Sequence, residues 1–554
     1  MLIFFIILKE DKKLNKKLLI IFTLTMFTVF GLVSLSFANN TLVFGVSLDV
    51  NELDPGSSVV SHVVDNIFEG LVKLKAGTTS IEPCLATSWE ISEEGKEIIF
   101  HLREGVKFHD GTDFNADAVV FSFARQYDPN NPYHKYGKWY YWDYMFSDIK
   151  EVKKLDDYSV KFILKRSNVS ILTSLTMDQV FIVSPANAEK YQENTYKHPC
   201  GTGPFRFVEW IKNDHVTLEA NENYWRESAK LDQLIFKVIP DPSARLMALE
   251  VGEIQGMEYP DPADFDRIKA NTELNLLSQP GMNIGYMAMN TGYGYIDKNK
   301  NGIRDMDSEP LVKTPGYFEP LTKKKVRQAI NLAIDKQSII DNIYMGTAIK
   351  AKNGIPPFML GYNDEVKDYS YDPKIAKELL AEAGYPDGFE VILHVMPVSR
   401  PYMFDPPKIA EAIHSYLAAV GIKVKIYQVD WANYLQELSD GKHQMCLLGW
   451  IGDNGDPDNF LNSAFSNNGA SIGLALNLAF YINDEAQELL SRALATYDNE
   501  KRETYYKKVQ EMIHEDAGWV YLAHATQNMV FRNNIKDFTP NPTGRLFFYP
   551  AWIY

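Results

Sequence analysis

Hydrophobic and polar residues alternate at the start of residues 99–125, a block whose pattern predicts several short elements in succession. Ile99, Phe100 and Leu102 lie among polar neighbours, which is typical of a half-buried strand. Glu104-Gly105 comes next and favours a turn. The block is therefore expected to begin as a strand that turns sharply at its end.

The second part of this block predicts a further strand, a turn and a helix. Val106–Phe108 fits a short strand, and Asp110-Gly111 is a strong turn dipeptide. Asn115 is a favourable helix N-cap, and Asp117 lies in the first helical turn, where its charge complements the helix dipole. The apolar face of this helix would consist of Val119, Val120 and Phe123. Turns, a cap and an apolar helix face all indicate scaffold.

Alternating helix and strand patterns occupy the second half of the chain. Apolar residues recur at helical spacing through Lys323–Tyr344, which predicts one helix. Asp372-Pro373 supplies a cap and a proline at the first helical position, and Gly384 ends that helix. Lys408–Val420 predicts another helix, and Ile422–Tyr427 alternates as a strand. Such helix-then-strand units indicate an α/β domain.

The length of the chain, 554 residues, is too great for one compact core, so two or three domains are expected. Asn40–Val50 predicts a first strand, and Val160–Phe236 contains strand-like pieces broken by proline and glycine. The sequence has no internal repeat and no low-complexity linker. We therefore expect the domains to be joined by strands that cross between them rather than by a flexible tether.

The composition is that of an ordinary globular protein with an acidic surface. The formal net charge of −16 argues against nucleic acid or an anionic membrane as a partner, because both require basic patches. Aromatic residues make up 13% of the chain, which fits either large cores or an aromatic-lined cleft. The basic cluster Lys323–Lys325 with Arg327 fits the solvated start of a helix.

The N-terminus has the pattern of an export signal. A lysine-rich stretch precedes the apolar run Leu18–Phe37, and Ser36-Phe37-Ala38 places small residues at positions −3 and −1 of a cleavage site. Residues 1–38 are therefore expected to be a cleaved signal peptide, which places the mature protein in the periplasm. The apolar run is long for a signal peptide, so a single membrane-spanning anchor is the alternative. No cysteine lies beside the cleavage site, which argues against a lipid anchor.

Residues 99–125 closely resemble the signature of the family 5 extracellular solute-binding proteins, the peptide-binding components of ABC transporters. Many consecutive positions of IFHLREGVKFHDGTDFNADAVVFSFAR match this signature. Three strings between residues 351 and 460 resemble the dipeptide-binding branch of the family: AKNGIPPFMLGYNDEVKDYSYDP, MPVSRPY and GWIGDNGDPDNF. The resemblance covers nearly the whole mature chain.

The resemblance implies an α/β fold, the two-lobed clamp of type II periplasmic binding proteins with an extra subdomain in the first lobe. The first lobe would comprise residues 39–282 and the returning segment 524–554. The second lobe would comprise residues 283–523, with an insertion at about residues 291–322 relative to the dipeptide-binding pattern. A ligand would bind between lobes that close on it.

Two charged residues carry the ligand prediction that the resemblance implies. Arg400, in MPVSRPY, would bind the carboxylate of a dipeptide, and Asp453, in GWIGDNGDPDNF, would bind its α-ammonium. A zwitterion needs one buried cation and one buried anion, and the planar fork of arginine suits a carboxylate. Taken singly, Arg400 fits a loop salt bridge and Asp453 a loop-capping carboxylate, but the two motifs in order favour the ligand roles. Candidate pocket walls are Trp450, Trp431 and Tyr402, with packing between the lobes as the alternative.

The function implied by the resemblance is that of a non-enzymatic periplasmic receptor. It would capture dipeptides or short peptides as a monomer and present them to an inner-membrane ABC permease, with no cofactor required; contact with a chemoreceptor stays open. A haem or glutathione receptor of the same fold is an alternative, because relatives have diverged to those ligands, whereas Arg400 and Asp453 together argue against nickel. A secreted hydrolase is a third alternative, but the chain contains neither HExxH nor GxSxG.

The insertion contains a pattern similar to a calcium-binding EF-hand loop. Oxygen-bearing residues occupy loop positions 1, 3, 5 and 9, and glycine occupies position 6. Position 12 is Ser308, where a bidentate glutamate belongs, so a polar surface hairpin is the alternative. The candidate ligands of a structural calcium ion are Asp297, Asn299, Asn301, Ile303 and Asp305.

The chain contains three cysteines, of which two can pair in an oxidising compartment. Cys84 and Cys200 both fall in the expected first lobe, so we expect a disulfide between them. Cys446 lies in an apolar run and fits a small buried hydrophobic residue. No CxxC motif and no His/Cys cluster at zinc spacing occurs in the sequence.

Overall fold

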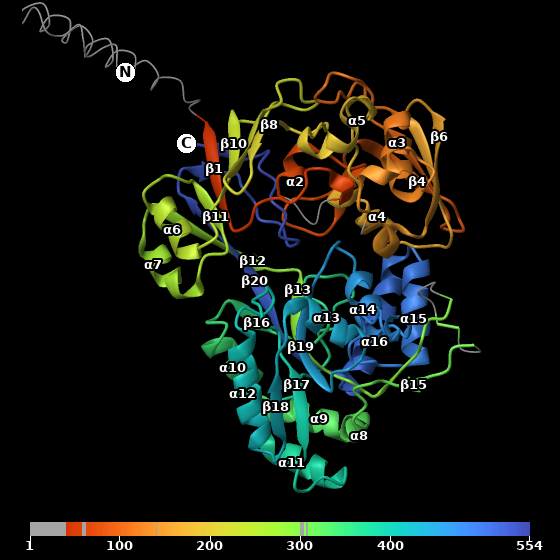
Figure 1. The fold of residues 1–554 in the computed structure, drawn as a ribbon, viewed down its shortest axis with the longest axis vertical. Coiled ribbons are helices and arrows are strands. Elements are labelled where there is room, and N and C mark those ends of the chain that lie inside the picture. Colours follow the sequence, from red (N-terminus) through yellow and green to blue (C-terminus); the bar gives the residue numbers. More distant parts are fainter. Residues whose placement is uncertain (1–39, 58–61, 140, 300–303, 306–307) are drawn as a thin grey trace, which may run out of the picture.

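The computed structural model describes residues 40–57, 62–139, 141–299, 304–305 and 308–554, so the predicted signal peptide, residues 1–38, lies outside the described residues. Figure 1 shows an upper lobe, coloured red to yellow, and a lower lobe, coloured green to blue. The C-terminal segment returns to the upper lobe. No helix within the described ranges is long and apolar enough to cross a membrane. The predicted α/β fold with two lobes is confirmed.

A twelve-stranded mixed sheet runs through both lobes. Its strands are β1 (Thr41–Val46), β8 (Phe205–Ile211), β9 (His215–Ala220), β10 (Gln233–Val238), β11 (Gly256–Glu258), β12 (Leu274–Pro280), β13 (Asn283–Met289), β16 (Ala348–Lys350), β17 (Glu390–His394), β18 (Lys423–Tyr427), β19 (Met445–Ile451) and β20 (Trp519–Arg532). The order is β18-β17-β19-β13-β20-β11-β1-β10-β9-β8, and β12 and β16 also pair with β20.

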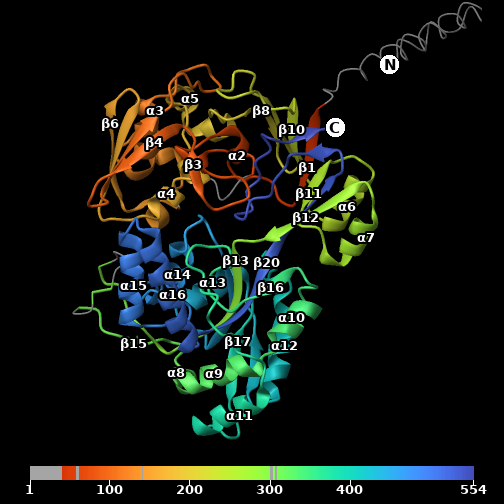
Figure 2. The same cartoon turned by 180° about the vertical axis from the view of Figure 1, so that it is seen from behind.

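The long strand β20 joins the lobes. Its first half pairs with β13 and β16 in the lower lobe, and its second half pairs with β11 and β12 in the upper lobe. Figure 2 shows β12 and β20 crossing between the lobes from behind. The predicted boundary after residue 282 falls between β12 and β13, and the predicted boundary after residue 523 falls inside β20. The lobes are therefore connected by ordered strands.

Helices pack on both faces of the lower part of this sheet and enclose one large apolar core. They are α8 (Glu319–Thr322), α9 (Lys324–Ala333), α10 (Lys336–Asn342), α11 (Pro373–Glu382), α12 (Pro406–Ala418), α13 (Trp431–Ser439), α14 (Asp458–Phe465), α15 (Asp484–Ala495) and α16 (Asn499–Glu515). The Asp372 side chain caps α11 as predicted, accepting the backbone N–H groups of Lys374 and Ile375. A small hairpin of β14 (Tyr293–Gly294) and β15 (Val312–Lys313) holds the base of the insertion.

The predicted single helix over Lys323–Tyr344 is wrong, because the structure has two helices, α9 and α10, in this segment. The backbone leaves the helical region at Ile334, and the Asp335 side chain accepts the N–H of Ser338 at 3.0 Å. An aspartate that caps a new helix competes with continuation of the old one. Apolar residues on both sides of the break face the same core, so their periodicity hides it.

An additional subdomain lies at the outer side of the upper lobe, coloured orange in Figure 1. Its four-stranded sheet has the order β4-β5-β7-β6, formed by β4 (Ala86–Ile91), β5 (Glu97–Leu102), β7 (Ser159–Leu164) and β6 (Ile149–Asp156). Helix α3 (Ala116–Tyr127) covers it. Asn115 caps α3 as predicted, accepting the N–H groups of Asp117 at 3.0 Å and Ala118 at 3.2 Å. The second strand predicted at Val106–Phe108 is absent, because this described segment forms only an isolated bridge between Lys107 and Asp113.

The other α-helices and β-strands of the upper lobe are short. They are α2 (Val64–Ile67), α4 (Ile171–Ser174), α5 (Pro185–Tyr191), α6 (Pro242–Glu250), α7 (Phe265–Ala270), β2 (Val72–Leu74), β3 (Ile81–Pro83), β21 (Ile535–Lys536) and β22 (Trp552–Ile553). Helices α6 and α7 pack with β11, β12 and β20 into a small core of their own beside the crossing strands.

The lobes also touch each other on the side away from the crossing strands, where α4 lies near α15 (Figure 1), so the structure is a closed form. The Asn454 side chain of the lower lobe donates to the Ser174 hydroxyl of the upper lobe at 2.9 Å. The Val169 N–H donates to the Leu494 carbonyl at 3.0 Å, and the Ser167 hydroxyl donates to the Ala495 carbonyl at 3.1 Å. These contacts close one side of the space between the lobes.

Candidate ligand-binding site

Residues of both lobes enclose a cavity of about 440 Å³, a volume in the range of small-molecule sites. The upper lobe contributes the segment after β1, the loop before α2 and the end of β11. The lower lobe contributes the turn after β19. Polar and charged residues in its walls include Ser47, Asp49, His62, Tyr141, Asp178, Glu258, Asn283, Asp453, Gln527 and Arg545. The cavity therefore lies where the sequence predicted a ligand, between the lobes.

Asp453 lies in the cavity wall and faces the opposite lobe. Its side chain accepts hydrogen bonds from the Asn459 amide, at 3.2 Å, and from the Tyr141 hydroxyl across the space between the lobes. Burial raises the pKa of Asp453 to about 6, although these two hydrogen bonds oppose the shift. No cation lies within ion-pair distance of Asp453 in the described part of the chain. A desolvated carboxylate without a cation is a site for a positively charged group.

Asn459, which was not among the site residues predicted from the sequence, orients Asp453. The Asn459 side-chain oxygen accepts the Trp450 indole N–H and the Asp453 backbone N–H, both at 3.0 Å. Its amide nitrogen donates to the Asp453 carboxylate. Asn459 lies within the string GWIGDNGDPDNF, but a matching string does not show which of its side chains contact one another.

Two other carboxylates of the same loop serve the scaffold. Asp456 is buried and forms an ion pair with Arg502, in which one guanidinium nitrogen donates to both carboxylate oxygens at 2.7 Å. Burial and the neighbouring charge of Asp456 raise the pKa of Asp458 to about 7. Neither residue lines the cavity, so Asp453 is the carboxylate of this loop that meets it.

Arg400 flanks the cavity beside Pro401, which lines it. The Arg400 guanidinium lies over the Trp431 ring, 4.4 Å from its centroid, and no carboxylate of the described residues lies within ion-pair distance of it. Two backbone hydrogen bonds with Met403, of 3.0 and 2.9 Å, fix the turn that carries Arg400. Trp431 in turn stacks on Tyr434. Trp431 therefore packs against the Arg400 guanidinium and does not form a wall of the cavity.

Tyr402 and Trp450 also differ from the predicted pocket walls. Tyr402 is 6% exposed in the lower core, its hydroxyl contacts the Met396 sulfur at 3.8 Å, and its ring packs against Gly449, where a Cβ would approach it to 2.1 Å. Trp450 is half-buried and donates to Asn459. Neither side chain lines the cavity: Trp450 is connected to Asp453 through Asn459, whereas Tyr402 belongs to the core.

The upper wall of the cavity contains a Glu258–His62 pair, neither member of which was predicted from the sequence. The Glu258 carboxylate accepts the Ser47 N–H at 2.7 Å and the Ser47 hydroxyl at 2.6 Å, and it lies 3.3 Å from the His62 ring. Burial opposes ionisation of Glu258, but the contacts with His62 and Ser47 outweigh it and lower its pKa. Burial by itself would lower the pKa of His62, but the contact with the Glu258 carboxylate outweighs burial, so the pKa of His62 is raised.

The charges around the cavity are predominantly negative. Arg545 lines it, but its guanidinium binds the buried Asp65 carboxylate, and the charge of His62 is met by Glu258. The cavity wall contains the four carboxylates of Asp49, Asp178, Glu258 and Asp453, against the two basic side chains of Arg545 and His62. Because like charges in a confined space repel, a ligand that brings net negative charge is disfavoured here.

The predicted disulfide between Cys84 and Cys200 is wrong, because all three cysteines are free and buried. Each thiol has another neighbour. Cys84 donates to Glu69 at 3.5 Å, and burial raises its pKa; burial followed by the charge of Asp110 raises the pKa of Cys200. Two cysteines in one lobe share a core without being adjacent, which spacing along the chain cannot reveal.

The insertion is organised around Glu309, which was not among the predicted calcium ligands. Glu309 is 1% exposed and accepts the backbone N–H groups of Lys298 at 2.8 Å, Asn299 at 3.4 Å and Asp305 at 3.0 Å. The predicted ligands Asn301 and Ile303 lie outside the described residues. Among the residues that the structure describes, no three His, Cys, Asp or Glu side chains are grouped to hold a metal ion. The calcium site stays a prediction.

Calcium is expected to raise the melting temperature of the protein if Asp297 and Asn299 are ligands. Binding to the folded state at about 100 times the dissociation constant stabilises it by about 2.7 kcal/mol. Alanine at both positions should abolish this rise and leave ligand affinity nearly intact, as measured by thermal melting and calorimetry with and without a chelator. A melting temperature of the parent protein that does not respond to calcium would end the hypothesis.

Comparison with known proteins identifies what this fold and site resemble. Residues 80–471 match the family model described as "Bacterial extracellular solute-binding proteins, family 5 Middle". The dipeptide-binding protein of Escherichia coli K12 is 39% identical over 497 residues, covering 87% of this chain and 88% of that protein. Heme-binding protein A of Haemophilus influenzae is 37% identical over 498 residues, covering 87% and 86%. The structure of the periplasmic binding protein DppA of Helicobacter pylori in complex with the peptide STSA superposes with a TM-score of 0.74 at 34% identity, covering 93% and 98%.

Proposed function

Because the chain belongs to the bacterial extracellular solute-binding proteins of family 5, we propose that it is the periplasmic substrate-binding component of a peptide ABC transporter. It captures dipeptides or short peptides between its lobes and delivers them to an inner-membrane permease. The peptide named in the Helicobacter pylori complex and the dipeptide-binding Escherichia coli relative support this proposal. As proposed, the protein acts as a monomer, needs no cofactor and is not an enzyme; contact with a chemoreceptor is a secondary part of the proposal.

The observation that carries the proposal is the Asp453 carboxylate in the closed cavity. Its raised pKa reflects a charge that has been removed from water without a compensating cation. The α-ammonium of a peptide supplies that cation and donates up to three hydrogen bonds. In this proposal the carboxylate end of the zwitterion binds Arg400, and the support for this role is that Arg400 stacks on Trp431 and has no carboxylate partner among the described residues. Both proposed contacts are with the lower lobe.

The charge of the cavity favours a peptide over the alternative ligands. Haem carries two propionates, and glutathione carries two carboxylates against one ammonium. Either ligand would bring net negative charge into a cavity whose wall has more carboxylates than basic side chains. A dipeptide with uncharged side chains is a zwitterion and therefore brings no net charge. We therefore place haem and glutathione behind peptides, although the Haemophilus influenzae relative is named for haem.

Calorimetry with the dipeptide Ala-Phe and its blocked forms tests the proposed function. We expect micromolar or tighter binding of Ala-Phe, because each charged end would meet a side chain of opposite charge. N-acetyl-Ala-Phe lacks the ammonium, and Ala-Phe amide lacks the carboxylate, so each should bind at least about a hundredfold more weakly, a loss of about 3 kcal/mol. Mass spectrometry of ligand carried through purification identifies what the protein holds when it is isolated.

The outcomes of this experiment separate the candidate functions. Binding of haem or glutathione in place of Ala-Phe would overturn the proposal in favour of that ligand. Equal binding of Ala-Phe and its blocked forms would show that the ammonium and the carboxylate do not contribute to recognition. Release of free alanine and phenylalanine during incubation would indicate a hydrolase instead.

A further inference from the structure

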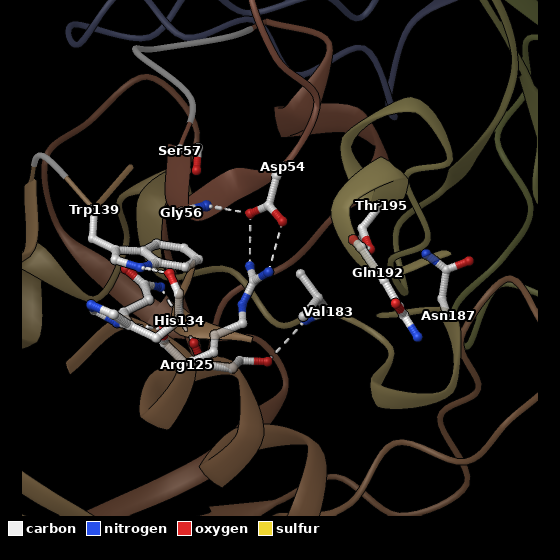
Figure 3. Close-up of polar contacts among 12 residues, drawn as sticks. Asp54, Gly56, Ser57, Arg125, His134, Trp139, Val183, Asn187, Gln192 and Thr195 are labelled. Carbon is white, nitrogen blue, oxygen red and sulfur yellow. Dashed lines mark hydrogen bonds and ion pairs between the residues drawn. The ribbon is translucent and has the colours of Figure 1, made fainter. Parts of the chain in front are cut away.

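A buried ion pair ties helix α3 to the loop that begins the upper wall of the cavity. The Arg125 guanidinium donates to both carboxylate oxygens of Asp54, with two N–O distances of 2.7 Å, and Arg125 is 4% exposed. Figure 3 shows the guanidinium pointing at the carboxylate, with Gly56 donating its N–H to the same carboxylate at 3.0 Å. Two-pronged pairs of this kind fix direction as well as distance. The loop at Asp54–Ser57 is therefore fixed in place by α3.

Trp139 extends this contact to a second segment of the cavity wall. Its ring lies over the Arg125 guanidinium, 5.1 Å from the charge to the ring centroid, and its N–H donates to the His134 carbonyl at 2.8 Å. The same ring covers Gly56, where a Cβ would lie 2.5 Å from it, so only glycine fits there. Beside it, the Lys138 N–H donates to the Ser57 hydroxyl at 2.9 Å. The segment at Lys138–Trp139 is thus joined to the loop that Arg125 holds.

The same face of α3 also holds a third segment of the wall. Gln126 donates to the Gln179 carbonyl at 2.9 Å, and Gln179 lines the cavity. The Ser122 hydroxyl accepts the Val183 N–H at 3.0 Å. One helix face thus supports three chain segments that are distant in sequence. Arg125 is at the centre of this face.

Tyr141 is the point at which this arrangement reaches the ligand site. It follows Trp139 by two residues, lines the cavity and hydrogen-bonds the Asp453 carboxylate of the opposite lobe. None of Arg125, Asp54 and Trp139 lines the cavity. Any effect they have on a ligand must therefore pass through the segments that they hold.

We propose that Asp54, Arg125 and Trp139 form a positioning clamp that holds the Tyr141 hydroxyl on Asp453, and that ligand affinity depends on this clamp although it does not touch the ligand. The inference rests on the proposed function, because it assigns a role in binding peptide at the same cavity. It gives the helix of block 99–125 a task in recognition: α3 fixes the upper-lobe group that orients the carboxylate of the lower lobe.

A double-mutant cycle with Tyr141 tests the clamp. The variant Asp54→Asn/Arg125→Met removes both charges together, so neither is left buried alone. We expect it to weaken Ala-Phe binding about tenfold in the parent background, but less than about twofold when Tyr141→Phe is already present. A residue that only maintains the fold would lower affinity by the same factor in both backgrounds. Affinity is measured by calorimetry below the melting temperature of every variant.

Two further variants keep the test decisive. Trp139→Phe retains the Asp54–Arg125 pair but loses the hydrogen bond to His134. It should therefore lower the affinity for Ala-Phe by less than the double variant does. This smaller loss should also disappear when Tyr141→Phe is already present. Arg327→Met is the matched control, because Arg327 is a buried arginine of the lower lobe whose bonds go to backbone carbonyls away from the cavity. It should lower the melting temperature and leave the Ala-Phe affinity unchanged.

The results distinguish the clamp from the proposed function. If the parent protein does not bind Ala-Phe, the proposed function fails. If the parent binds and the folded clamp variants bind equally well, or lose affinity equally with and without the Tyr141 hydroxyl, the clamp is wrong and the proposed function stands. Loss of affinity in Arg327→Met equal to that in the clamp variant would also contradict it.

Discussion

Replacing Asp453 by asparagine should lower the affinity for Ala-Phe by about 3 kcal/mol, on the order of a hundredfold. The amide keeps the size of the side chain and its bond to Asn459, but it cannot neutralise an ammonium in a site removed from water. N-acetyl-Ala-Phe lacks that ammonium, so its weak binding should be nearly the same in both proteins. Calorimetry with both ligands measures the effect.

The stability of the empty protein provides an independent control for this variant. Asp453 is a carboxylate whose ionised form is disfavoured by burial, so asparagine should leave the melting temperature unchanged or raise it. A loss of affinity that comes with a large fall in melting temperature would point to misfolding instead. Unchanged affinity in a folded variant would show that another group binds the ammonium.

The pH dependence of binding should report the same carboxylate. The pKa of Asp453 is raised to about 6, so the ligand-free protein is increasingly protonated there as the pH falls below 6. A bound ammonium favours the ionised form, so affinity should fall by up to about tenfold per pH unit below that value. This fall in affinity below pH 6 should disappear in Asp453→Asn. The titration of His62, whose pKa is raised from 6.5, should remain in both proteins.

Replacing Arg400 by methionine should lower the affinity for Ala-Phe by about 2 to 3 kcal/mol. Methionine retains apolar contact with the Trp431 ring, so the loss measures the charge and the fork of donors rather than packing. Ala-Phe amide lacks the carboxylate and should bind the parent and the variant alike. Calorimetry with the two ligands gives the comparison.

Lysine at position 400 separates charge from geometry. It retains one positive charge but loses the planar fork that can bind a carboxylate through two hydrogen bonds. We expect Arg400→Lys to recover part of the loss seen in Arg400→Met. Equal binding of Ala-Phe by the parent protein and Arg400→Met would remove Arg400 from the site and leave Asp453 as its proposed anchor.

Local signals in the sequence predicted local structure well, but they failed where the structure depends on contacts between segments that are distant in sequence. The Asn115 cap of α3 and the Asp372 cap of α11 were confirmed because an N-cap bonds within a few residues. The break at Asp335 was missed because apolar residues on both sides of it face one core. The absent Cys84–Cys200 disulfide was likewise a question of distance in space.

The same limit applies to the candidate site. The string that contains Asp453 indicated the loop, but its match to a family could not show that Asn459 orients the carboxylate or that Tyr141 reaches it from the other lobe. Tyr402 was predicted as a wall because it is near Arg400 in sequence. Its ring instead occupies the space that Gly449 leaves open, on the core side of the turn. Proximity along the chain does not fix direction.

The strand β20 has a consequence for how the whole molecule unfolds. Its first half contributes Trp519–Ala523 to the core of the lower lobe, and its second half contributes Met529, Val530 and Phe531 to the two cores of the upper lobe beside the crossing. Large proteins with separate domains ordinarily melt domain by domain. Here neither lobe can release its share of the strand without exposing apolar residues in the other. We therefore expect the two lobes to unfold together as one cooperative unit.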